Sequence, residues 1–138
     1  MNDNRILKWG FAWAATVAQF LFGGWSLPMQ MLIAFMVLDY LTGVGAAFVG
    51  KRLDSAVGAR GIAKKAGVMV VIAMAHLLDQ AVGIEAPVLQ TAVTWFYLGN
   101  EGLSILENLG LIGVPIPEPI RASLSRLKAE ADGDVGGD

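Results

Sequence analysis

Residues 9–38 read WGFAWAATVAQFLFGGWSLPMQMLIAFMVL, and no charged side chain occurs in this stretch. A membrane-crossing helix needs about 20 apolar residues, because the hydrocarbon core of a bilayer is about 30 Å thick. Within the stretch, residues 23–28 (GGWSLP) combine glycines with a proline, a combination typical of a turn. The stretch therefore predicts two membrane spans, at about residues 9–27 and 29–49, that form a tight helical hairpin.

The composition of the whole chain also indicates a membrane protein. Hydrophobic residues make up 55% of the 138 residues and charged residues 16%, whereas an ordinary soluble domain has about 25% charged residues. The formal net charge of −2 gives no basic excess for binding nucleic acid, and the absence of cysteine excludes disulfides and thiolate metal sites. We expect an all-α integral membrane protein that binds the lipid bilayer, with no cofactor and no nucleic-acid partner.

Two further spans are predicted in the second half of the chain. One covers about residues 66–82, and the other covers about residues 88–106, directly after Pro87, which is well suited to a first helical turn. Residues 51–65 contain five Lys and Arg and are predicted to form a basic polar loop. The prolines after the last span cannot continue a helix. Residues 113–138 are therefore expected to form a Pro-containing linker, a short amphipathic helix at about Ile120–Glu130 and an acidic, disordered tail.

The positions of the basic residues predict the orientation. All ten Lys and Arg lie within residues 5–8, 51–65 and 121–128, and the connections at 23–28 and 83–87 have none. Cytoplasmic segments carry the excess of Lys and Arg. Four crossings place all ten on the cytoplasmic side, whereas three crossings, the alternative, would place the last three on the opposite side. We therefore expect four spans within a membrane domain at 9–112, with residues 1–8 and 113–138 both cytoplasmic.

Asp39 is the most informative single residue, because it lies midway along the second predicted span. An ionised carboxylate at the centre of a bilayer costs roughly 2.5–3.5 kcal/mol on insertion scales, so it must face protein or water. Thr42 follows one helical turn later on the same face. Two interpretations remain open: Asp39 and Thr42 line a pore, or Asp39 is a paired or protonated structural carboxylate inside a helix bundle.

Polar residues also form a stripe along the last predicted span. Asn100, Ser104 and Glu107 follow one another at helical spacing, and Glu101 and Asn108 lie on either side of them. Such a stripe indicates a water-lined surface or a polar seam between helices. The alternative is that the helix emerges into the cytoplasmic headgroups near Glu101, which would leave these side chains solvated.

Small residues at intervals of four predict close helix packing. They occur in the first two spans as Gly10, Ala14 and Ala18, and as Gly43 and Ala47. Small side chains let two backbones approach closely, which is how helices associate in lipid. This packing lies either within one chain or between chains of a homo-oligomer.

No residue pattern in the sequence predicts an enzyme or a metal site. His76 and Asp79 share a helix face, but a single histidine without further ligands is a weak metal site, and an interfacial pair is the preferred interpretation. The sequence contains no P-loop, no nucleophile elbow and no zinc-protease motif. Catalytic activity is not expected.

Several segments in a fixed order resemble the phage holin family that also includes toxin-secretion holins. The resemblance extends from about Met29 to Lys128. It is carried by Leu38-Asp39-Tyr40-Leu41-Thr42-Gly43, by Lys64-Lys65 at the end of the basic segment, by Leu78-Asp79, by the stretch YLGNEGLSILEN at residues 97–108, and by Gly113, Pro115, Ile116 and Pro117. The order and spacing of these segments are more specific than any one of them.

The resemblance implies a holin, a multi-pass protein of the host cytoplasmic membrane that assembles into oligomers late in phage infection. Its lesions would release an endolysin, the functional partner, or a toxin. In this interpretation Asp39, Thr42, Asn100, Glu101, Ser104, Glu107 and Asn108 match motif positions. The alternative function is a small four-helix transporter or ion channel in which Asp39 is the coupling carboxylate.

Overall fold

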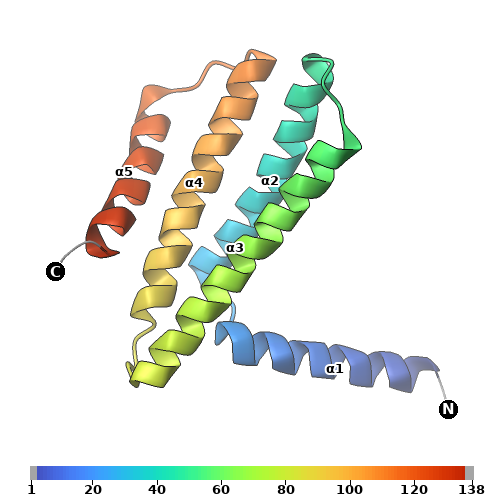
Figure 1. The fold of residues 1–138 in the computed structure, drawn as a ribbon, viewed down its shortest axis with the longest axis vertical. Coiled ribbons are helices and arrows are strands. Elements are labelled where there is room, and N and C mark those ends of the chain that lie inside the picture. The colour runs from blue at the N-terminus through green and yellow to red at the C-terminus, as the bar shows by residue number, and fades with distance from the viewer. Residues whose placement is uncertain (1–2, 136–138) are drawn as a thin grey trace.

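The protein is helical throughout residues 3–135 apart from short connections, and these are the residues that the computed structural model describes. The helices are α1 (Asp3–Phe22), α2 (Leu27–Val49), α3 (Ser55–Val82), α4 (Val88–Ile112) and α5 (Glu118–Val135). Figure 1 shows α2, α3 and α4 as a bundle, with α5 folded back along α4 and α1 projecting away. We call the end of the bundle with residues 23–26 and 83–87 the foot, and the end with residues 50–54 and 113–117 the head. The all-α prediction is confirmed for the described residues.

Two of the described helices, α2 and α3, are long and apolar enough to cross a membrane. α2 has 23 residues and begins after Ser26, whose hydroxyl accepts a hydrogen bond from the Met29 amide; at 1.5 Å per residue it is about 35 Å long. Large apolar side chains on the outside of both helices are exposed, among them Leu41, Phe48, Val70 and Met74. An apolar surface of this extent suits lipid rather than water.

The segment predicted as a basic loop is largely helical. α3 begins at Ser55, so only the first residues of 51–65 form a connection. The Asp54 carboxylate caps this helix by accepting a hydrogen bond from the Ala56 amide at 2.9 Å. Basic side chains were taken as a sign of a loop, but Lys and Arg are good helix formers and do not end a helix. The prediction therefore placed the start of the third helix too late.

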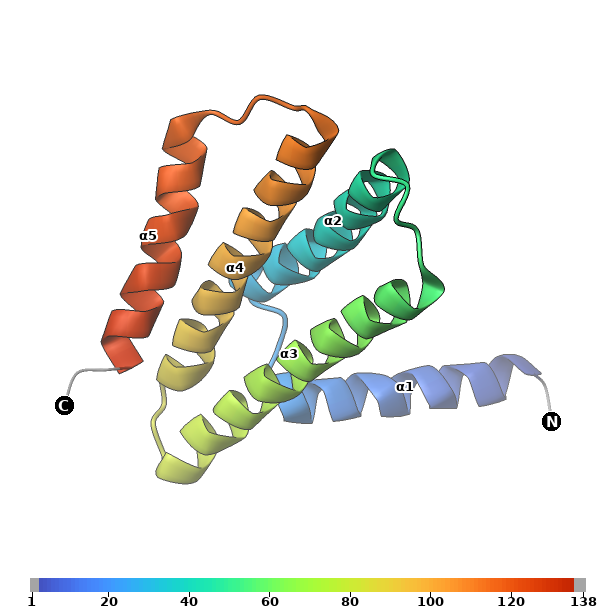
Figure 2. The same ribbon diagram turned by 45° about the horizontal axis from the view of Figure 1, so that its top comes forward.

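The C-terminal helix is also longer than expected. A short helix was predicted at Ile120–Glu130, and α5 extends from Glu118 to Val135. Residues 131–135, expected in a disordered tail, belong to this helix, whereas residues 136–138 of that tail lie outside the described residues. α5 lies beside α4, and Figure 2 shows it at the left edge of the molecule, on the side of α4 away from α2.

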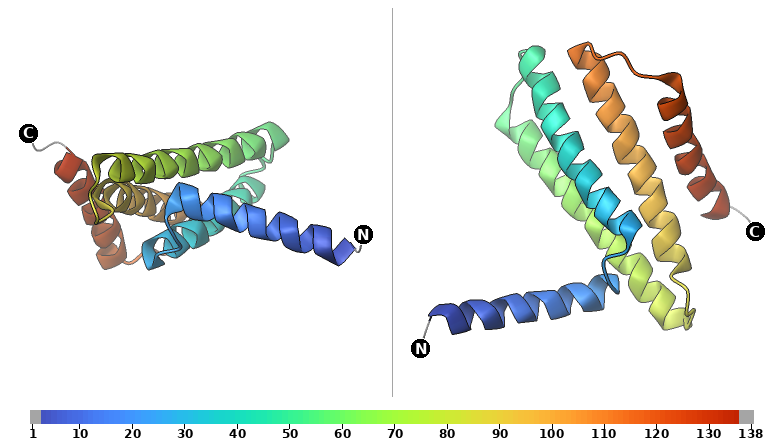
Figure 3. Two further views of the ribbon diagram at one scale, coloured as in Figure 1. Left: turned by 90° about the horizontal axis from the view of Figure 1, so that it is seen from below. Right: turned by 180° about the vertical axis from the view of Figure 1, so that it is seen from behind.

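α1 does not form the predicted hairpin with α2. It runs across the foot of the bundle, and both views in Figure 3 show it extending away from the other helices. Gly23 and Gly24 have φ angles of 69° and 129°, which redirect the chain between the two helices. A Cβ atom on Gly23 would lie 2.3 Å from Cε1 of His76, so the turn is packed directly against the α3 imidazole. The Gln90 side-chain amide also donates to the Phe22 carbonyl oxygen at 2.8 Å.

The apolar core lies between α2, α3 and α4, in the half of the bundle nearer the foot. Its fully or nearly buried members are Met29, Leu32 and Met36 of α2, Val68 and Ile72 of α3, and Leu98 of α4. These side chains interdigitate at helical spacing on each helix. The head half of the bundle contains the buried Ala46 and Leu106 and, beside them, a group of polar side chains.

Asp79 joins α3 to the start of α4. Pro87 at the N-cap position of α4 provides no side-chain hydrogen bond. The Asp79 carboxylate takes this role and accepts from the Leu89 and Gln90 amides at 3.0 and 2.9 Å, with only 1% of the residue exposed. Its neighbour His76 packs on Gly23 instead, so the two residues serve separate contacts at the foot. In the described part of the chain, no three His, Asp or Glu residues gather as metal ligands would.

Replacing Asp79 by alanine is expected to destabilise the protein by about 1–2 kcal/mol, because the Leu89 and Gln90 amides at the start of α4 lose their acceptor. Thermal unfolding of the purified protein in detergent measures this loss. The matched control is Asp54→Ala, which removes an exposed cap from α3 and should lower the unfolding temperature less. Equal shifts for the two variants would contradict a structural role for the Asp79 cap.

Candidate functional site: a polar cleft between α2, α3 and α4

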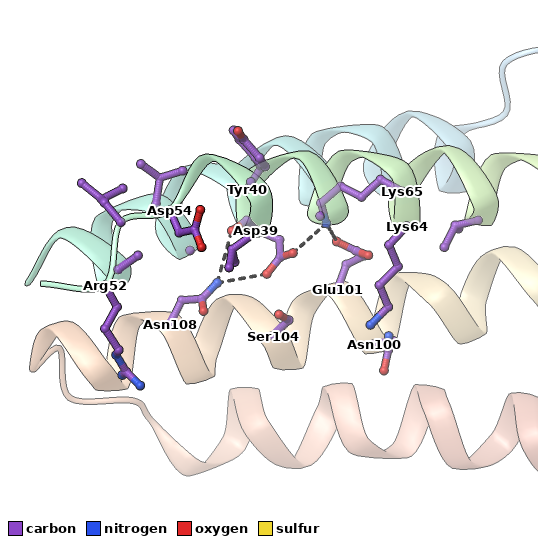
Figure 4. A pocket seen from close by; sticks show the side chains of 18 of the residues that line it. Asp39, Tyr40, Arg52, Asp54, Lys64, Lys65, Asn100, Glu101, Ser104 and Asn108 are labelled. Carbon is purple, nitrogen blue, oxygen red and sulfur yellow. Dashed lines mark hydrogen bonds and ion pairs between the residues drawn. The ribbon is translucent and has the colours of Figure 1, made fainter. Parts of the chain in front are cut away.

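Three charged side chains from three different helices meet in the head half of the bundle. Lys65 of α3 donates to Asp39 Oδ2 of α2 at 2.6 Å and also to Glu101 Oε2 of α4. Figure 4 shows the ammonium group between the two carboxylates. We call Asp39, Lys65 and Glu101 the charge triad. It bridges all the helices of the bundle at one depth.

The helix geometry explains why these residues meet. Asp39 and Lys65 are each ten residues from the head end of their helix, Val49 in α2 and Ser55 in α3. At 1.5 Å per residue both lie about 15 Å below that end. Because α2 and α3 are consecutive and antiparallel, residues at equal distance from their connection come to the same level. Glu101 reaches this level from near the middle of α4.

The charge triad is shielded from solvent but not sealed from it. The exposed fractions of the side chains are 16% for Asp39, 17% for Lys65 and 9% for Glu101. An unpaired charge in such a place is costly, and pairing offsets much of the desolvation. With both carboxylates ionised, the triad carries a net charge of −1. Lys65 is therefore the counter-ion that both acids depend on.

Asn108 extends the network towards the head. Its side-chain amide donates towards Asp39 Oδ1 at 3.0 Å, the Asp39 carbonyl oxygen at 3.2 Å and Thr42 Oγ1 at 3.1 Å. Thr42 in turn donates to the Leu38 carbonyl oxygen at 2.8 Å. This set of bonds ties α4 to α2 and leaves Asp39 with partners on both of its carboxylate oxygens.

A cavity of about 290 Å³ lies over the charge triad. Its wall includes Asn100 and Ser104 of α4 and Gly43 and Ala47 of α2, and residues 52–54 lie at its head end. The lining is mixed, with both acidic and basic groups. A cavity with these walls suits water and gives the triad a route to the head end of the bundle.

The structure brings together most of the residues predicted as a polar seam. Asp39, Thr42, Glu101 and Asn108 are bonded in one network, and Asn100 and Ser104 line the same cavity. Glu107 is exposed and is not among the residues of the cavity wall. The alternative of a simply solvated stripe fits Glu107, whereas Glu101 is buried and paired.

Lys65 is the residue that the sequence interpretation missed. It was assigned to a cytoplasmic loop because it lies next to Lys64 in a basic segment. Two carboxylates within apolar helices require a positive partner, and Lys65 directly precedes the predicted third span. That requirement was the available signal. Lys64, the neighbouring residue, is exposed and also lines the cavity.

The two predicted small-residue faces lie in different surroundings. Gly43 faces α4, since a Cβ atom there would lie 3.5 Å from the Asn108 amide nitrogen, and Ala47 lines the cavity. On α1, nothing lies within 4 Å of a Cβ built on Gly10, and Ala14 is exposed. Ala18 is half-buried at the contact with α3. The packing role of the α1 residues stays a prediction.

Two glycines of α4 let α5 pack closely against that helix. A Cβ atom on Gly99 would lie 3.1 Å from the Leu124 carbonyl oxygen, and one on Gly102 would lie 2.8 Å from a Leu124 methyl group. Lys128 reaches Asn100 Oδ1 at 3.4 Å and lies over the Phe96 ring. The close fit lets a charged helix cover one flank of α4, beside the polar cleft.

The chain is similar over most of its length to a known family and to several bacterial proteins. The profile of the bacteriophage holin family matches residues 16–129. An uncharacterized 14.9 kDa protein in the nagH 3′ region of Clostridium perfringens is 41% identical over 91% of this chain and 96% of its own length. A probable holin of Bacillus phage phi105 is 34% identical over 75% of this chain and 76% of its own length. No solved structure matches the chain. The chain belongs to the bacteriophage holin family.

Proposed function

We propose that this protein is a holin that accumulates in the bacterial cytoplasmic membrane, self-associates and forms lesions through which an endolysin passes. Membership of the holin family supports the proposal. The chain contributes a physical argument of its own. Its two edges differ in polarity, and a subunit of that kind is suited to surround an aqueous opening.

The proposal rests on the difference in polarity between the exposed side chains of α3 and those of α5. The α3 edge exposes apolar side chains such as Val70, Met74 and Leu78, as a lipid-facing helix does. The α5 edge exposes charged side chains, including Arg121 and Arg126. Charged groups at hydrocarbon depth cannot face lipid without a high cost. Within a membrane, the α5 edge must therefore face water or other copies of the chain.

In this proposal α2, α3 and α4 cross the bilayer, with the head end of the bundle in the cytoplasm. The connection at residues 50–54 then carries Lys51 and Arg52 on the cytoplasmic side. This arrangement also has three spans, but it leaves out the first predicted span, so that Arg5 and Lys8 rather than the last three basic residues lie on the outer side. We prefer it to four spans because α1 does not lie alongside the bundle.

The polar cleft gives such a subunit a second state. In the compact state the charge triad and Asn108 satisfy one another between the helices. If the helices separate during assembly, the same groups can be solvated by water in an opening. Polar groups that are costly in lipid are stable in both situations, and this favours a lesion-forming role.

Inducible expression in a bacterium, together with a phage lysozyme that lacks a secretion signal, tests the proposed function. We expect growth to stop abruptly after a delay and turbidity to fall only when the lysozyme is active. A catalytically inactive lysozyme is the matched control. Growth arrest without lysozyme release would favour the small-channel alternative, and undisturbed growth at full membrane accumulation would contradict both.

A further inference from the structure

α1 is an unpartnered helix over most of its length. None of its residues is buried, and Trp9, Phe11 and Trp13 are more than 70% exposed. Only its C-terminal part, where Val17, Ala18, Leu21 and Phe22 are half-buried, contacts the bundle. An aromatic surface of this size is typical of a helix that contacts lipid or another protein.

The side chains of α1 divide into two faces. At 100° per residue, Arg5, Lys8, Ala12, Ala15 and Gln19 fall within one narrow stripe, with Thr16 beside it. Apart from Asp3 and Asn4 in the first turn, the rest of the circumference is apolar and includes the phenylalanines and tryptophans. A broad apolar face with a basic stripe is the pattern of a helix that lies in a membrane interface.

The stripe points away from the bundle. The half-buried residues Val17, Ala18 and Leu21, which face α3, are centred on the side of α1 opposite Lys8 and Gln19. The apolar face of α1 is therefore turned towards the bundle. When α2, α3 and α4 stand across a bilayer, that side of α1 faces the hydrocarbon and the basic stripe faces water.

The junction at the foot holds α1 in this direction. Three features lie within a few residues of this junction. Gly23 and Gly24 have positive φ angles, and the His76 imidazole packs against Gly23. The Gln90 side chain donates a hydrogen bond to the Phe22 carbonyl oxygen. α1 consequently runs across the axis of the bundle (Figures 1 and 3). Its 20 residues extend about 30 Å along the membrane plane.

We propose that α1 lies flat in the membrane interface at the foot of the bundle and binds anionic phospholipid headgroups through Arg5 and Lys8. Trp9 and Trp13, both towards one border of the apolar face, then lie at headgroup level, where indole rings are favoured. This inference rests on the membrane location of the proposed function, but not on lysis. It places the N-terminus on the outer side of the membrane.

Labelling of single thiols tests the orientation of α1, and the chain is suited to it because it contains no cysteine. Ala12→Cys and Ala15→Cys place a thiol on the basic stripe, and Ala14→Cys places one on the apolar face between them. We expect a membrane-impermeant maleimide to label the first two on intact cells about tenfold faster than the third, since interfacial helices bury one face. A spanning helix would protect all three alike, and that result would overturn the proposal.

Two controls separate this inference from the proposed function. Ser55→Cys, at the head end, must remain unlabelled until the cells are opened, which shows that the membrane is intact at the time of labelling. Extraction of the protein by alkaline carbonate would contradict its membrane location and overturn both proposals. Fast labelling at positions 12 and 15 with slow labelling at position 14, in cells that never release lysozyme, would leave the α1 inference standing and overturn the holin function.

The charge of the partner is tested in vesicles. The full-length Ala14→Cys protein is reconstituted in phosphatidylcholine alone or with phosphatidylglycerol. We expect the thiol to be labelled several-fold more slowly in the anionic vesicles, because an anionic surface attracts basic residues that lie close to it. Arg5→Gln combined with Lys8→Gln should remove the difference. An unchanged difference in that variant would overturn headgroup binding by these residues.

Discussion

Replacing Lys65 by methionine is expected to reduce the folded, membrane-integrated protein severely. The substitution keeps the length and apolar stem of the side chain but leaves Asp39 and Glu101 as two neighbouring carboxylates without a counter-ion. Removing one partner from a shielded ion pair typically costs about 3–5 kcal/mol, and the opening of the cleft to water places this site near the lower value. The amount of full-length protein in the membrane fraction and its unfolding temperature in detergent measure the effect.

Two comparisons make the Lys65 result specific. Lys64→Met removes the same charge from the adjacent, exposed residue and should leave accumulation and unfolding unchanged. Combining Lys65→Met with Asp39→Asn and Glu101→Gln removes all three charges and should restore most of the protein. Failure of this neutral triple variant to recover, or an equal loss in Lys64→Met, would show that the charge balance of the triad is not what stabilises the bundle.

The double variant Asp39→Asn/Glu101→Gln is expected to lose more stability than the two single variants added together. Each single substitution leaves Lys65 one carboxylate and keeps an oxygen that can accept its hydrogen bond. We expect each to cost about 1 kcal/mol or less, and the double variant about 3 kcal/mol, because it strands the ammonium group. Unfolding in detergent gives the coupling between the two positions.

The release assay gives a second measurement for the same variants. Asp39→Asn should integrate normally but change the time of lysozyme release, since it weakens a contact that the helices must break to separate. Asp39→Leu, which also removes the acceptor for Asn108, should change it further. If Asp39→Asn, Glu101→Gln and the double variant all match the parent in unfolding temperature and in release time, neither carboxylate has the role assigned to the triad.

The parts of this fold that follow from local chemistry were predictable from the sequence. α2 agrees closely with its predicted span because a glycine-proline turn and a long charge-free run bound it. The polar side chains of α4 were also identified, since their helical spacing is visible in one dimension. The contact of Asn108 with Asp39 depends on how the helices pack against each other, and the spacing of residues along one helix does not reveal it.

The features that were missed depend on contacts between distant segments. Counting Lys65 as a loop charge ignored that a lysine almost three turns inside a helix can pair with two acids on other helices. The direction of α1 depends on His76 and Gln90, which are far along the chain from Gly23. Gly99 and Gly102 are visible in the sequence as sites where another helix could approach, but only the structure shows that this helix is α5.

The charge triad also bears on the order in which the protein is assembled during synthesis. Asp39 and Lys65 belong to consecutive helices, so they can pair as soon as α3 has emerged, before α4 exists in the membrane. Within the α2–α3 hairpin the charges of Asp39 and Lys65 then balance each other, and both helices are long and apolar enough to cross a membrane. Glu101 arrives later on α4 and joins an ammonium group that is already in place. Lys65 is thus the group with which Glu101 pairs when α4 inserts. The Lys65→Met variant should be impaired both in the pairing of α2 with α3 and in this later step.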